Sequence, residues 1–96
     1  MIPGTTSKLS ESRVASAATI QAKTDIVLVT GSTAVNTIIP NFGGGFSGLL
    51  ILIPVSGALT LGTTGNILVG LAAVQNRALF MVYVKSLGKW VINSGV

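Results

Sequence analysis

Residues 49–53 read Leu-Leu-Ile-Leu-Ile, and Pro54 follows them directly. A continuous apolar run of this length that ends at a proline is typical of a buried strand, because a buried helix needs more residues and proline removes a backbone donor. The segment therefore predicts a β-strand that is buried on both faces. A fold that contains such a strand needs further strands on both sides of it.

Short apolar segments recur on both sides of this run and are separated by Gly, Thr, Ser, Asn or Gln. They predict further strands over residues 26–30, 34–39, 59–61, 67–69, 78–84 and 90–92. Short strands at a spacing of roughly 8–12 residues are typical of a sandwich, a barrel or a jelly roll. The sequence therefore predicts a compact, antiparallel all-β domain over residues 18–96.

Residues 1–17 have a different character, since they are rich in Ser, Thr, Ala and Gly and show no sustained apolar period. They predict an extended N-terminal arm that becomes ordered only against a partner. A short helix over residues 10–18 is a less favoured alternative. We expect Lys8 and Arg13 of this arm to meet carboxylates on the partner surface.

The composition indicates that part of the domain is covered. Hydrophobic residues make up 49% of the chain and charged residues 8%, against roughly 25% charged in an average soluble domain. A small domain has a large surface for its volume, so this shortage favours oligomerisation, docking on a larger partner or burial in a membrane. Residues 46–74 are the most apolar window, but Pro54 and several glycines interrupt it, which argues against a membrane helix.

The segment 78–84 gives the local argument for an oligomer. It reads Ala-Leu-Phe-Met-Val-Tyr-Val, and a two-layer monomer cannot bury both faces of such a strand. We predict that Leu79, Met81 and Tyr83 lie in an interface between copies of the chain.

The ionisable residues exclude most enzyme chemistry. Glu11 and Asp25 are the only carboxylates, and the chain has no histidine or cysteine. General acid–base catalysis and metal binding draw on these residue types at close quarters, so we expect no enzyme, no metal and no cofactor. A hydrolase that uses Asp25 with a Ser or Thr is the weakest alternative. The net charge of +4 is scattered along the chain, which does not favour nucleic-acid binding.

Three motifs have a structural and a functional interpretation. Residues 43–48 match the spacing G-x-G-x-x-G, but a strand follows instead of the helix that a phosphate-binding loop requires, so we expect a plain loop. Asn66 is expected to bond the backbone of its turn, or else to join a sugar-binding surface. Trp90 and Lys89 form a possible platform for a carbohydrate or base; the favoured interpretation has Trp90 closing the core and the Lys89 stem covering an apolar rim.

Several short motifs follow one another in a fixed order between about residues 18 and 90. They are Ile38-Ile39-Pro40, Gly45-Phe46-Ser47-Gly48, Leu52-Ile53-Pro54, Thr64-Gly65-Asn66-Ile67, Tyr83 and Lys89-Trp90. This order resembles a small β module of tailed-bacteriophage virion proteins, although the turn after the tyrosine strand is basic here. The resemblance implies a non-catalytic, trimer-forming part of a capsid-decorating protein or a tail fibre.

These observations lead to one functional expectation and one alternative. We expect a capsid decoration (cement) protein on the virion surface, which forms a homotrimer and binds the major capsid protein through Lys8 and Arg13. The alternative is a tail-fibre or receptor-binding module that recognises a glycan on the host surface.

Overall fold

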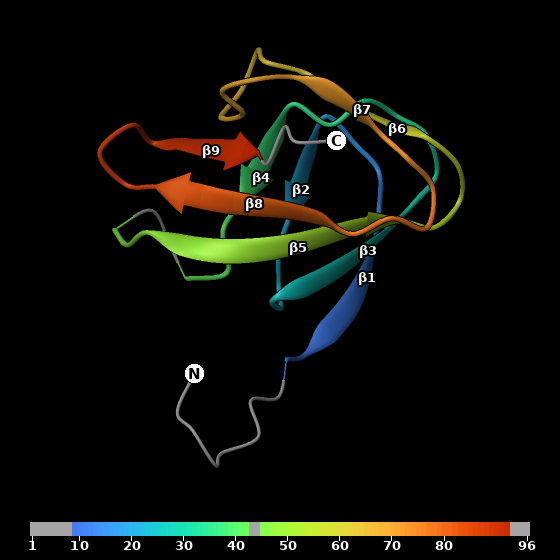
Figure 1. Ribbon diagram of the computed structural model, residues 1–96, viewed down its shortest axis with the longest axis horizontal. Helices are drawn as coiled ribbons and strands as arrows, with labels where there is room; N and C mark the ends of the chain where they lie inside the picture. The colour runs from blue at the N-terminus through green and yellow to red at the C-terminus, as the bar shows by residue number, and fades with distance from the viewer. Residues whose placement is uncertain (1–8, 43–44, 93–96) are drawn as a thin grey trace.

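The computed structural model describes residues 9–42 and 45–92, and this part of the chain folds into strands and turns without a helix (Figure 1). The strands are β1 (Glu11–Ala15), β2 (Thr19–Gln21), β3 (Ile26–Thr30), β4 (Thr37–Ile39), β5 (Gly48–Pro54), β6 (Leu59–Leu61), β7 (Leu71–Ala73), β8 (Leu79–Val84) and β9 (Lys89–Ile92). The prediction of a compact all-β domain is confirmed.

The largest unit is a five-stranded sheet, here called the main sheet, in the order β1-β3-β5-β8-β9. Strands β1, β3 and β5 run parallel, whereas β5, β8 and β9 run antiparallel. The prediction of an antiparallel fold is therefore wrong for half of the molecule. The main sheet stays open, with β1 and β9 at its two edges in the described part of the chain.

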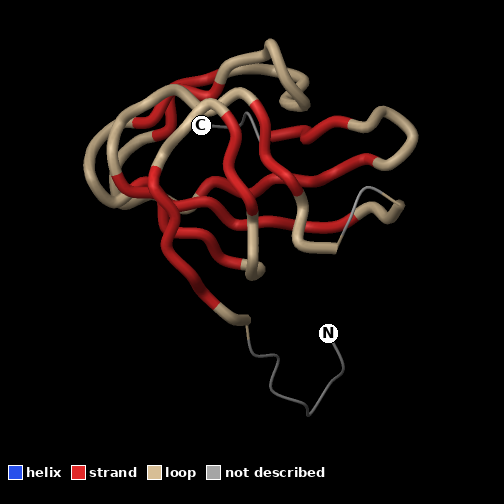
Figure 2. The backbone as a smooth tube through the Cα atoms, turned by 180° about the vertical axis from the view of Figure 1, so that it is seen from behind, coloured by secondary structure: helices blue, strands red, loops and turns tan. Residues whose placement is uncertain are grey.

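The parallel pairs of the main sheet, β1–β3 and β3–β5, are joined by two crossover connections. Parallel neighbours need a connection that leaves the sheet and returns, and β2 and β4 lie within these two connections. They pair with each other in parallel behind the main sheet (Figures 1 and 2). Strands β6 and β7 form a separate antiparallel pair. Apolar alternation is the same for both strand directions, so the sequence pattern carried no information about the crossovers.

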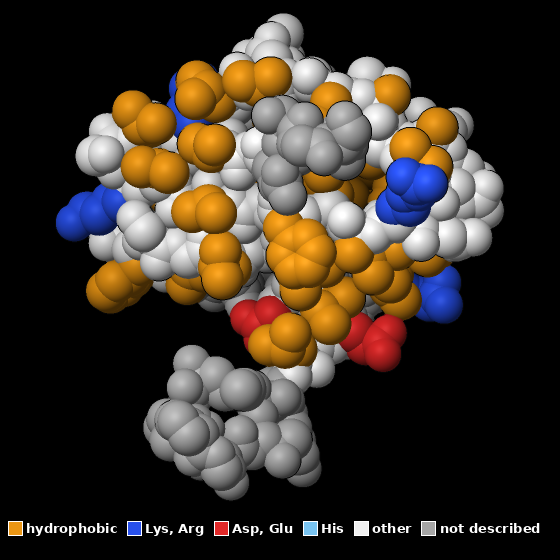
Figure 3. All heavy atoms as spheres, viewed as in Figure 1, with side chains coloured by type: hydrophobic (Ala, Val, Ile, Leu, Met, Phe, Trp, Pro, Cys, Tyr) orange, Lys and Arg blue, Asp and Glu red, His pale blue; other side chains and the backbone are white. Residues whose placement is uncertain are grey.

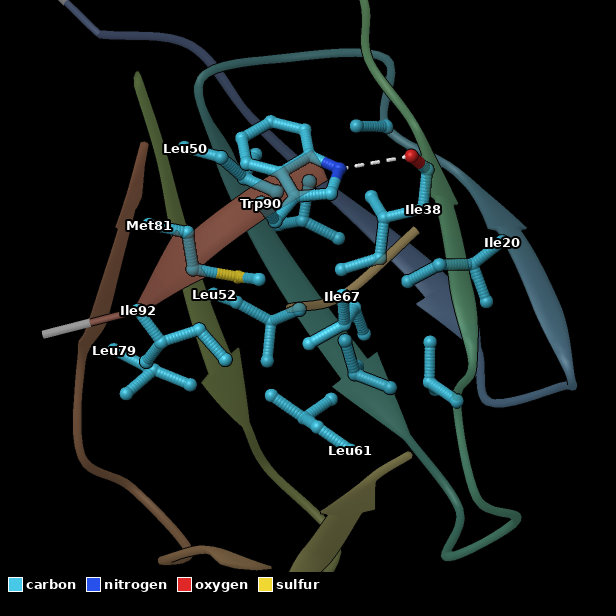
Figure 4. Close-up of a cluster of buried hydrophobic side chains, with 14 of the residues drawn as sticks. Ile20, Ile38, Leu50, Leu52, Leu61, Ile67, Leu79, Met81, Trp90 and Ile92 are labelled. Atoms are coloured by element: carbon cyan, nitrogen blue, oxygen red, sulfur yellow. Dashed lines mark hydrogen bonds between the residues drawn. The ribbon is translucent and has the colours of Figure 1, made fainter. Parts of the chain in front are cut away.

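The core lies between the main sheet and the β2–β4 pair (Figure 4). Val27, Leu52, Met81 and Trp90 of the main sheet have no exposed surface, and neither does Ile38 of β4. Each aliphatic side chain of this size stabilises the fold by roughly 1.5–3 kcal/mol when it is fully buried. The core therefore ties together strands that lie far apart in the sequence.

Two strand predictions need correction. Strand β5 is not buried on both faces, because only its alternate residues Leu50 and Leu52 point into the core while Leu49 is 67% exposed. Residues 67–69 do not form a strand; Ile67 makes only an isolated bridge to Trp90. Strands β2 and β7 were not predicted, since three-residue strands carry little periodic signal.

The predicted N-terminal arm is also different. Strand β1 pairs with β3 from Glu11 beside Ile26 to Ala15 beside Thr30. Residues 11–15 therefore belong to the main sheet, and the prediction of an arm is wrong for them. The surface that orders this segment is β3 of the same chain. Residues 1–8, with Lys8, lie outside the described residues.

Candidate interaction face

The side of the main sheet that points away from the core, here called the outer face, is almost entirely apolar. Successive side chains of a strand point to opposite faces, and the buried positions identify which side is the core. The apolar side chains on the other side are Ile26, Leu28, Leu49, Ile51, Ile53, Phe80, Val82, Val84 and Val91. This face is the candidate functional surface.

Strand register joins these side chains into rows across the sheet. The two most complete rows are Ile26–Ile51–Phe80 and Leu49–Val82–Val91. Directly opposed side chains lie about 4.5–5.5 Å apart at Cβ, so each row is a continuous apolar ridge. Hydrophobic side chains accordingly gather over β5 and β8 in the space-filling view (Figure 3).

The rows remain accessible to a partner. Leu49, Phe80 and Val82 are exposed, with Phe80 at 55% and Val82 at 41%. Strand spacing and rise give the outer face an area of roughly 400 Å². This value lies within the range of the largest apolar patches on monomers, roughly 300–600 Å², which are often functional.

In the described part of the chain, charged groups occur only at the borders of the outer face. Glu11 and Arg13 are exposed on β1 at one edge, and Lys89 is half-buried on β9 at the other. The Lys89 ammonium donates a hydrogen bond to the Gly65 carbonyl at 3.0 Å. The middle of the face therefore has no charge that a partner would need to neutralise.

A hollow of about 450 Å³ adjoins the outer face where β5 begins. Leu9, Phe42, Leu49 and Phe80 line it, and Asp25 is the one charged residue in its wall among those that the structure describes. The apolar wall makes this hollow a continuation of the outer face rather than a polar site for chemistry.

The predicted oligomer interface on β8 is on the wrong face of the strand. Leu79, Met81 and Tyr83 are 6%, 0% and 7% exposed and belong to the core. The intervening Phe80 and Val82 point outward instead. Since every residue from 79 to 84 is apolar, alternation alone could not tell which set faces inward; the pairing with β5 decides it.

The predicted ligand platform is wrong for Trp90, because its ring has no exposed surface. The ring packs edge-to-face against Tyr83 at 5.2 Å and Phe42 at 6.2 Å between centroids. Its indole N–H donates to the Ile38 carbonyl at 2.9 Å (Figure 4). The favoured interpretation, in which Trp90 closes the core, is confirmed.

Asn66 has the expected structural role with an unexpected partner. Its side-chain oxygen accepts the Ile38 N–H at 2.8 Å, and its side-chain nitrogen donates to the Ile38 carbonyl at 2.7 Å. The amide thus bonds β4 rather than its own turn.

Within residues 9–42 and 45–92, no three His, Cys, Asp or Glu side chains lie close enough together to hold a metal ion. The same residues contain no helix that is long and apolar enough to cross a membrane. Comparison with protein-family models, with curated proteins and with solved structures gives no match for this chain.

Proposed function

We propose that the chain is a structural virion protein, a capsid decoration (cement) protein whose copies associate as a trimer and cover the shell of the major capsid protein. The observation that carries this proposal is the outer face, an exposed apolar sheet surface without a central charge. The resemblance of residues 18–90 to virion β modules supports the same class. In this assembly Phe80 and Val82, not the buried residues that alternate with them on β8, meet the neighbouring copies.

The size of the outer face limits the strength of the contact that it can make. Stable interfaces bury about 800 Å² on each partner, and the outer face offers roughly half of that area. Apolar burial of this extent gives a weak contact between two chains, because association itself costs several kcal/mol. Firm attachment therefore comes from multivalency, in which each trimer meets the shell at several points.

The contact with the shell involves the basic residues near the N-terminus. Arg13 is exposed on β1, so its guanidinium is available to a carboxylate of the capsid protein. Lys8 lies outside the described residues, and its contact stays a prediction. A truncation that tests this region should remove residues 1–8 only, since removal of β1 would also open the main sheet.

Sedimentation velocity tests the association. The wild-type protein should form a trimer at micromolar concentration, and Val82→Lys should shift it toward the monomer. Val74→Lys is the matched control, because Val74 is an exposed valine outside the main sheet, and it should sediment as the wild type. A wild-type chain that stays monomeric at high concentration contradicts the trimer.

Co-sedimentation with shells assembled from the major capsid protein tests the virion role. We expect the wild-type protein to bind and the truncation of residues 1–8 to bind more weakly. A trimer that forms normally but never binds shells would overturn the decoration role and leave the association intact. The glycan-recognition alternative loses its candidate platform, because the Trp90 ring is buried.

A further inference from the structure

Strand β1 leaves half of its backbone hydrogen-bonding groups without a strand partner in the described part of the chain. The Ser10 carbonyl accepts the Ile26 N–H at 3.1 Å, and the Ser16 N–H donates to the Thr30 carbonyl at 2.7 Å. Backbone groups alternate in direction along a strand in a parallel pair. The even-numbered residues 10–16 therefore face β3, while the N–H and carbonyl groups of Glu11, Arg13 and Ala15 point away from the sheet.

The opposite edge of the main sheet is covered at Trp90. On β9, the Trp90 N–H donates to the Asn66 carbonyl at 2.7 Å, and the Trp90 carbonyl accepts the Leu68 N–H at 3.0 Å. The segment around residue 67 thus blocks strand addition there. Among the described residues, the open edge of the main sheet is β1, and an open edge is a template for another strand.

The charges on β1 select the strand that fits. Glu11 and Arg13 are both exposed and, being two residues apart, lie on the same face. In an antiparallel pair of two β1 strands centred on Ser12, Glu11 lies opposite Arg13 of the partner subunit, and the second such pair follows by symmetry. Opposite charges in directly facing positions stabilise a strand pair, and like charges destabilise it.

Other antiparallel registers fit less well. A shift that centres the pair on Arg13 would place two guanidinium groups opposite each other, with Glu11 facing Ala15 of the partner subunit. A shift by one residue would oppose groups that already bond β3. In the register centred on Ser12, Leu9 faces Ala15 of the partner subunit, which sets a large side chain against a small one.

We propose that β1 binds β1 of a second copy in this antiparallel register, across a two-fold axis at Ser12. The pairing joins two main sheets edge to edge and extends the apolar outer face from one copy to the next. It does not compete with contacts of Phe80 and Val82 on the outer face, because strand bonds lie in the plane of the sheet and side chains stand perpendicular to it. In a paired copy the Arg13 guanidinium faces Glu11 of the partner subunit, so it no longer contacts a capsid carboxylate. A two-fold contact of this kind would link one trimer to another, and it does not depend on the virion role.

The charge register gives the first test, made in the Val82→Lys background so that the outer face does not contribute. We expect a monomer–dimer equilibrium that Arg13→Glu weakens by about tenfold, because carboxylates then face each other. The double variant Glu11→Arg/Arg13→Glu exchanges the two charges and should restore the dimer. Failure of this rescue overturns the register, and a gain in affinity on Arg13→Ala would indicate the register centred on Arg13.

Amide hydrogen exchange gives a second test that does not rely on charge. The amides of Ser12 and Val14 bond β3 and should be protected at every concentration. Those of Glu11, Arg13 and Ala15 should exchange fast in the monomer and become protected as the dimer forms. A dimer in which these outward amides stay unprotected would overturn strand pairing. That outcome would not touch the proposed trimer, which the Val82→Lys variant tests separately.

Discussion

The indole N–H of Trp90 donates a hydrogen bond of 2.9 Å to the backbone carbonyl of Ile38, across 52 residues of sequence. The same carbonyl accepts the side-chain N–H of Asn66. On this side of β4, the side chains of Asn66 and Trp90 therefore bond the Ile38 backbone groups that a neighbouring strand would otherwise bond. This arrangement links β9 of the main sheet to the second layer and fixes the distance between them.

Replacement of Asn66 tests this link most directly. Asn66→Ala removes both hydrogen bonds to Ile38 and leaves a backbone donor without its partner, so we expect a loss of about 2–4 kcal/mol in the free energy of unfolding. Urea denaturation measures the change. Asn41→Ala is the control, because Asn41 is exposed in a turn, and it should change stability by less than about 0.5 kcal/mol. Equal losses in the two variants would show that the amide is not structural.

Trp90→Phe keeps an aromatic ring in the core and removes the indole donor. We expect a loss of about 2–3 kcal/mol, part from the hydrogen bond and part from the smaller ring. Because Trp90 and Asn66 share the Ile38 carbonyl, the double variant with Asn66→Ala should depart from additivity by at least about 0.5 kcal/mol. A strictly additive cycle would show that the two donors act independently.

Gly65 holds the turn before Asn66 close to β4. A Cβ at this position would overlap the Asn36 carbonyl and the Thr37 hydroxyl. We expect Gly65→Ala to destabilise the fold by about 1–3 kcal/mol, the range for overpacking. Gly45→Ala is the matched control, since a Cβ there meets nothing within 4 Å. A melting temperature that falls equally in both variants would contradict this account.

Sequence patterns located most strands and missed how they are arranged. Long apolar runs such as residues 49–53 and 78–84 are strands in the structure. Residues 11–15 read Glu-Ser-Arg-Val-Ala, without the sustained apolar period that predicts a strand, although this polar pattern suits the edge position that they occupy. Strand direction was not readable either, since a parallel crossover and a hairpin give the same alternation.

The candidate site is likewise only partly predictable from the sequence. The composition predicts an apolar surface, because the chain has too few charged residues to coat a small domain. The outer face is such a surface, and its cover by another chain stays a prediction. The composition could not name the residues, since β8 is apolar at every position. Likewise, Trp90 beside Lys89 resembled a ligand platform, and only the pairing of β9 with β8 shows that the ring points inward.

Variants of the neighbouring residues Phe80 and Met81 on β8 distinguish effects on association from effects on folding. Phe80 is 55% exposed on the outer face, whereas Met81 is fully buried. We expect Phe80→Ser to change the stability of the monomer by less than about 1 kcal/mol and to weaken self-association. Met81→Ser should cost about 2–5 kcal/mol, because it leaves a cavity and a buried hydroxyl. Denaturation curves at protein concentrations below and above the association range distinguish the two effects: the Phe80 variant should lose only the concentration-dependent part of the stability. If Phe80→Ser unfolds the dilute monomer as strongly as Met81→Ser does, the outer face is part of the core of the fold rather than a surface for partners.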